Sequence, residues 1–130
     1  MTRQELSELI DLHRREKALE ERRERLRESV QRYAAPLSDM PHGSSWKDPM
    51  AEYAAKLDEL DRQILDLVMQ IENRIQQIED FTKSLTPNQA AVVRLRYENG
   101  YSWGRIAKEL NYSKGHCRNL HTDAMKRLDL

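Results

Sequence analysis

The stretch SWGRIAKELNYSKGHCRNLH, Ser102–His121, contains two short helical patterns on either side of a turn. Ser102 and Ser113 each stand just before a pattern, where a serine side chain can accept a hydrogen bond from a free backbone N–H group of the helix. Asn111 falls at the turn, where the backbone usually requires a left-handed conformation that asparagine adopts more readily than most residues. The stretch therefore predicts a helix-turn-helix.

Apolar residues recur through this stretch at the spacing that two packed helices require. A further helix should precede them, because TPNQ at residues 86–89 is a capping box with proline at the first helical position and Gly100 suits a left-handed helix end. We expect helices over residues 87–98, 103–110 and 114–128. The expected core residues of the helix-turn-helix are Ile106, Ala107, Leu110, Cys117 and Leu120.

Two long segments before this domain have the composition of amphipathic helices. Residues 2–34 contain neither Gly nor Pro, and after a loop at residues 35–48 the pair Asp48-Pro49 starts a second helix that should run to about residue 84. This second helix repeats apolar residues every seven positions, as a coiled coil does. The expected seam residues are Leu57, Leu60, Ile64, Leu67, Ile71 and Ile78.

A helix with such a seam needs a partner in water. One arrangement is an antiparallel hairpin with the first helix, another is a parallel dimer, and both hold if two hairpins associate. Arg74 interrupts the seam, so it either extends its charge outward or meets an acid on the partner helix. The fold class is all-α, with a hairpin or coiled-coil oligomerisation region at residues 1–85 and a helix-turn-helix domain at residues 86–130.

Composition argues for a binding protein. A chain of 130 residues has little material for a deep enzymatic cleft, and it contains no nucleophile elbow, phosphate-binding glycine loop or paired catalytic constellation. We therefore expect no catalysis, cofactor or metal. Cys117 and His121 have a spacing that suits zinc, but a buried, apolar Cys117 is the better interpretation.

The lone cysteine and the lack of a long apolar run predict a cytoplasmic protein without a membrane span.

The formal net charge is zero, but the charges are segregated along the chain. Residues 1–35 carry 9 Lys and Arg against 8 Asp and Glu, residues 36–85 carry 5 against 10, and residues 86–130 carry 8 against 4. The excess of positive charge therefore lies in the helix-turn-helix segment, which indicates contact with nucleic acid. The exposed polar residues there are expected to be Lys114, His116, Arg118, Asn119, Arg105, Lys108, Arg94 and Arg96. The competing interpretation is a three-helix bundle that binds nothing.

The segment LTPNQAAVVRLRYENGYSWGRIAKELNYSKGHCRNLHTDAMKRL resembles region four of bacterial sigma factors, which binds the −35 promoter element. The shared features are Arg96-Tyr97, Gly100, Ser102, Ile106-Ala107, Ser113, Ala124 and Leu128. The whole chain is similar to small phage-encoded sigma-like regulators of the ArpU and RinA kind. The resemblance implies base contacts from Lys114, Gly115 and Asn119, and DNA-backbone contacts from His116 and Arg118. Arg105 and Lys108 are expected to contact the DNA backbone as well, because exposed cations can neutralise phosphates. Gly115 departs from the family because it has no side chain to contact a base.

These observations predict a sequence-specific, sigma-like transcription regulator of phage or prophage origin that binds double-stranded DNA and acts with RNA polymerase. We expect a homo-oligomer, with a dimer favoured, because one short helix contacts few bases. Two alternatives stay open. One is a small terminase-like subunit that marks phage DNA for packaging, and the other is a module that binds polymerase without binding DNA.

Overall fold

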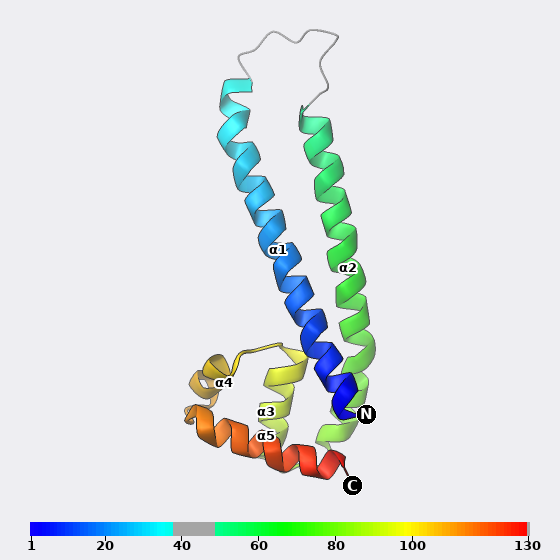
Figure 1. Cartoon of the computed structure of the whole chain (residues 1–130), viewed down its shortest axis with the longest axis vertical. Coiled ribbons are helices and arrows are strands. Elements are labelled where there is room, and N and C mark those ends of the chain that lie inside the picture. The colour runs from blue at the N-terminus through cyan, green and yellow to red at the C-terminus, as the bar shows by residue number, and fades with distance from the viewer. Residues whose placement is uncertain (38–48, 130) are drawn as a thin grey trace. The chain divides into compact units, whose positions relative to one another are not determined.

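The computed structural model describes residues 1–37 and 49–129. Its elements in chain order are α1 (Arg3–Leu37), α2 (Pro49–Thr82), α3 (Pro87–Val93), the π-helix η1 (Arg94–Glu98), α4 (Trp103–Leu110) and α5 (Lys114–Leu128) (Figure 1). No strand occurs among these described residues, so the all-α prediction is confirmed. Within the same ranges, no helix is both long and apolar enough to cross a membrane.

The helix bounds follow the sequence patterns, with differences at the ends. α1 continues through residues 35–37, which were expected to belong to the loop, and residues 38–48 of that loop lie outside the described residues. α2 ends at Thr82 rather than near residue 84, because the chain there tightens into a turn in which Leu85 N–H donates to the Thr82 carbonyl at 3.1 Å. Helix ends commonly differ by such amounts from a sequence estimate.

The chain packs as two compact units. The terminal unit comprises Met1–Arg14 and Met69–Leu130, and the hairpin unit comprises Arg15–Val68. This division by packing passes through both long helices, whereas the expected boundary between residues 85 and 86 follows the sequence patterns. The latter stays a prediction about how functions are divided along the chain.

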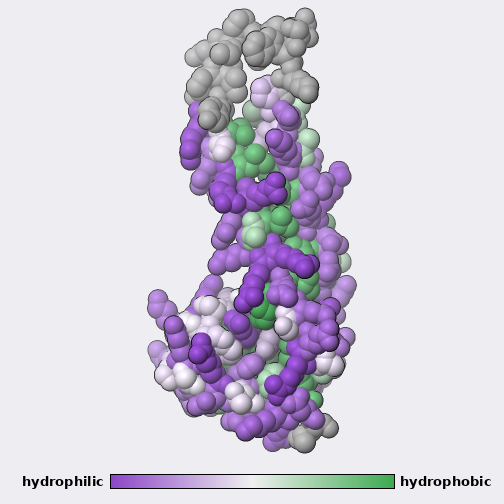
Figure 2. Space-filling view, viewed as in Figure 1, coloured by the Kyte–Doolittle hydropathy of each residue, from purple (hydrophilic) through white to green (hydrophobic). Residues whose placement is uncertain are grey.

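The hairpin unit consists of antiparallel parts of α1 and α2. Arg23 Nε lies 2.6 Å from Asp61 Oδ1, and a shallow groove runs between residues 15–19 of α1 and residues 63–67 of α2. Among the seam residues of this unit, Leu60 and Leu67 are buried, but Leu57 and Ile64 are only half-buried. One chain therefore covers its own seam incompletely, and Figure 2 shows hydrophobic residues still visible at the surface of the long helices.

The terminal unit brings the start of α1 against the end of α2. Leu6, Leu9, Ile71 and Ile78 are buried here. Arg74 Nη1 donates to the Glu5 carbonyl at 3.1 Å and pairs with Glu8 Oε2 at 3.0 Å. Arg74 thus meets an acid on the facing helix, which was one of the two expected outcomes.

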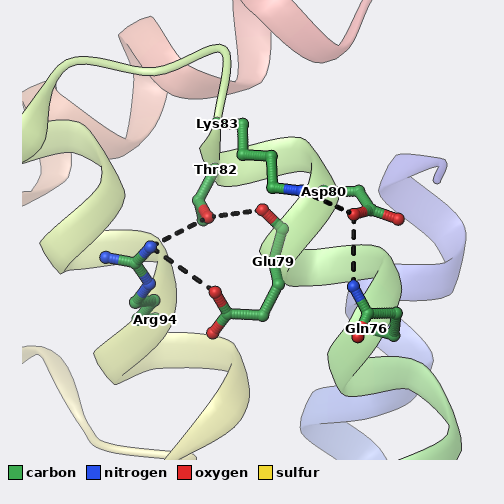
Figure 3. Close-up of polar contacts among 6 residues, drawn as sticks. All are labelled: Gln76, Glu79, Asp80, Thr82, Lys83 and Arg94. Carbon is green, nitrogen blue, oxygen red and sulfur yellow. Dashed lines mark hydrogen bonds and ion pairs between the residues drawn. The ribbon is translucent and has the colours of Figure 1, made fainter.

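The joint between α2 and α3 is fixed by polar contacts (Figure 3). Thr86 and Gln89 form the expected capping box, with distances of 3.3 Å and 3.2 Å between the side-chain oxygens and the opposite backbone nitrogens. Arg94 Nη2 donates to Thr82 Oγ1 at 3.3 Å and lies 3.5 Å from Glu79 Oε2. The guanidinium of Arg94 therefore pairs with α2 while its side chain is still 46% exposed, and its place on a basic face stays a prediction.

Candidate nucleic-acid interface

The core beneath the interface joins α3, α4 and α5. Val92, Ile106 and Cys117 are fully buried, and Ala107, Leu110 and Leu120 pack against them with several aromatic side chains. Burial raises the pKa of the Cys117 thiol, so this group stays protonated and behaves as a small hydrophobe. The described residues contain no cluster of three metal-ligating side chains. All five expected core residues thus lie on the inner sides of α4 and α5.

The angle between α4 and α5 is set by their caps and by the turn. Ser102 Oγ accepts from Arg105 N–H at 3.3 Å, and Ser113 Oγ accepts from His116 N–H at 3.1 Å. Asn111 has φ 58° and ψ 39°, which is the left-handed conformation expected at the turn. Tyr112 N–H then donates to the Ala107 carbonyl at 3.0 Å and closes the end of α4.

The outer face of α5 lies opposite Cys117. At 100° per residue, Gly115 and Asn119 project away from the core together with Thr122 and Lys126, and all four are exposed. Thr122 and Lys126 were not among the expected site residues. They could have been found from sequence, since they follow Asn119 at three and seven positions, which is the spacing of one helix face.

Gly115 is not required by the packing of the chain. A Cβ atom added there would meet nothing nearer than Ser113 Oγ at 4.0 Å, and Gly115 has no positive φ. The absence of a side chain therefore leaves the backbone of α5 open at the surface.

The remaining expected contact residues flank this face in different ways. Lys114 lies over Gly104 of α4, where an added Cβ would be 3.3 Å from Lys114 Cε. The His116 ring stacks edge-on against Tyr112, with centroids 4.6 Å apart. Arg105 lies 3.7 Å over the Tyr101 ring. Lys108 and Arg118 are also exposed.

Sequence did not predict how α5 is anchored. Tyr97 lies in the π-helix η1, and its hydroxyl is hydrogen-bonded to His121 Nε2 at 2.6 Å. Burial lowers the pKa of His121, and the charges of Arg96 and Arg3 lower it further, so the ring is neutral and able to accept this hydrogen bond. Trp103 packs edge-on against the same ring at 5.1 Å. These contacts fix the rotation of α5 about its axis.

Two caps, a left-handed turn, a shared core and an exposed second helix together define a helix-turn-helix. Residues 83–129, about a third of the chain, match the family model described as Sigma-70, region 4. This segment is therefore a sigma region-four domain, a DNA-binding domain of the helix-turn-helix type and not one of an enzyme family. No curated protein and no solved structure matches the chain.

Proposed function

We propose that this protein is a sequence-specific, sigma-like transcription regulator of phage or prophage origin that acts with RNA polymerase in the cytoplasm. The observation that carries the proposal is the exposed face of α5 on a region-four domain. One face of α5 packs on the domain core, and its opposite face is exposed. Such a helix can enter a major groove, which is wide enough for one α-helix.

The roles within the interface follow from chemistry and position. The Asn119 amide can pair with an adenine edge, and Lys114 can donate to guanine. Gly115 would let the backbone of α5 approach the DNA closely. We assign the backbone contacts to Arg105, Lys108, His116 and Arg118, because cations and polar donors near a groove neutralise or hydrogen-bond phosphates.

Selection from random duplex DNA tests this proposal, followed by titration of the selected and a scrambled duplex at two salt concentrations. Asn119→Ala should reduce the preference for the selected duplex, whereas Arg118→Ala should weaken both duplexes and lower the salt slope by about one unit. Asn88→Ala, which removes an exposed amide from α3, is the matched control. Equal losses on both duplexes for Asn119→Ala would refute its base contact.

We also propose that two hairpins associate into a dimer through residues 1–85, while residues 86–130 bind DNA. The half-buried seam residues Leu57 and Ile64 support this, as do Leu65 and Met69, which are 61% and 53% exposed in the single chain. Sedimentation analysis gives the number of chains. A ring of many copies would instead favour a packaging subunit, and polymerase binding without any duplex binding would favour a polymerase-interaction module.

A further inference from the structure

A cavity of about 310 Å³ lies within the terminal unit, between the start of α1 and the helices of the DNA-binding domain. α1 contributes Asp11 and Arg14 to its wall, η1 contributes Arg96, and α4 and α5 contribute Trp103 and His121. None of these residues is in the outer face of α5. The cavity therefore forms a second polar surface, between α1 and the helix-turn-helix and separate from the outer face of α5.

The cationic side chains of this cavity differ in how well they are neutralised. Arg3 is paired, because its Nε donates to Asp129 Oδ1 at 3.0 Å and to Oδ2 at 3.1 Å. Arg14 has only a distant contact, 3.8 Å from Asp11 Oδ1, and its side chain is 73% exposed. Arg96 Nη1 donates to the Tyr101 carbonyl at 2.9 Å, which is an uncharged acceptor.

The guanidinium of Arg96 is held in place without a carboxylate partner among the contacts of the described residues. Its Cζ lies 4.9 Å from the centroid of the Trp103 ring, so stacking and one hydrogen bond to a carbonyl orient the group. Burial lowers the pKa of Arg96, and the positive charges of Arg14 and Arg118 lower it further. The interaction with Tyr97 acts in the opposite direction and raises this pKa. Arg14 on α1 and Arg96 on η1 both line the cavity, and their like charges repel each other.

We propose that Arg14 and Arg96 together bind a backbone phosphate of duplex DNA, so that α1 extends the DNA-binding surface beyond the helix-turn-helix. This inference rests on the proposed function. An oxyanion between the two groups would relieve their repulsion, and planar guanidinium groups suit phosphate oxygens. The phosphate is assigned to DNA because His121, which lines the cavity, lies one helical turn after Arg118, an expected backbone contact on α5.

Arg14→Ala in the full chain tests the contact directly. Loss of one phosphate contact should weaken binding to the selected and the scrambled duplex equally and lower the salt slope by about 0.9. The ratio of wild-type to variant affinity should thus shrink about threefold between about 50 mM and about 200 mM salt. Arg14→Lys should restore part of the affinity. Arg27→Ala is the matched control, because it removes the same charge from an exposed position further along α1 that does not line the cavity.

Asp11→Asn provides a test in the opposite direction. This change removes the only carboxylate among the residues that line the cavity, so affinity for both duplexes should rise. Thermal unfolding of each variant checks that the fold is unchanged.

The outcomes separate this contact from the proposed function. Preferential binding of the selected duplex with no change for Arg14→Ala would overturn the α1 contact and leave the regulator intact. No duplex binding by the wild type would overturn both. Titration with pyrophosphate distinguishes a free anion from DNA: saturable, Arg14-dependent pyrophosphate binding together with an unchanged duplex affinity for Arg14→Ala would show that the cluster binds a small phosphorylated ligand instead.

Discussion

Replacing Glu98 with glutamine is expected to stabilise the protein at pH 8 and to leave its stability unchanged at about pH 4. Burial raises the pKa of Glu98 from its ordinary value of 4.5 to about 7, helped by a hydrogen bond with Glu79 and by the charges of Glu79 and Glu72, against the opposing charge of Arg94. One oxygen of the Glu98 carboxyl, Oε1, is enclosed without a hydrogen-bond partner. The carboxyl is therefore largely protonated in the folded state below neutral pH.

The direction of the pH effect follows from proton binding. Between pH 4.5 and about 7 the folded protein retains the Glu98 proton while the unfolded chain has lost it, so the free energy of unfolding falls as pH rises through this window. A shift of this size corresponds to about 3 kcal/mol for a fully enclosed group. Because Glu98 is only partly buried, solvent screening reduces the expected loss to about 1 kcal/mol.

Urea unfolding followed by circular dichroism at pH 4, 6 and 8 measures this loss. Glu98→Gln keeps a hydrogen-bond donor for Glu79 but cannot ionise, so its free energy of unfolding should exceed that of the wild type by about 1 kcal/mol at pH 8. Glu109→Gln, on the exposed side of α4, is the control and should follow the wild type. Parallel pH profiles for the wild type and the Glu98→Gln variant would refute the raised pKa of Glu98.

Three further substitutions test other parts of the structure. Gly115→Ala should raise the free energy of unfolding by up to about 1 kcal/mol, because alanine favours the helix. The same change should weaken duplex binding, and an unchanged affinity in a titration would exclude a close approach of the α5 backbone to DNA. Gly100→Ala should lower the melting temperature, since φ is +71° and the added Cβ would lie 2.6 Å from His13 Cγ; an unchanged melting curve would contradict this contact. Ile106→Ala should cost about 2–5 kcal/mol in urea unfolding, as expected for a fully buried side chain, and a loss below about 1 kcal/mol would place Ile106 outside the core.

The elements that sequence predicted well are those set by local chemistry. Ser102, Ser113 and Asn111 each have one favourable backbone role, and the structure places each in that role. The end of α3 could not be predicted in this way. The pattern indicated one regular helix over residues 87–98, but residues 94–98 form a π-helix, which shifts every later side chain around the axis. Tyr97 and Glu98 both lie in this π-helix.

Long-range packing explains the other differences. Glu79 and Thr82 of α2 bind Arg94, and nothing local in the sequence indicates that α2 lies there. Similarly, Leu6 is 1% exposed, although it was not among the residues that the sequence analysis singled out. Both residues report contacts between segments that are far apart in the chain.

The α5 helix is held in place by residues of α1, which lies outside the DNA-binding domain. His13 of α1 donates from Nε2 to the Tyr97 carbonyl at 2.7 Å, and the Tyr97 hydroxyl is in turn hydrogen-bonded to His121 near the middle of α5. At the end of α5, Asp129 accepts a two-pronged hydrogen bond from Arg3. A structural change at the start of α1 would therefore act on the rotation of α5 through Tyr97 and on its far end through Asp129. Since the proposed base contacts depend on that rotation, the first fourteen residues of the chain help to position α5.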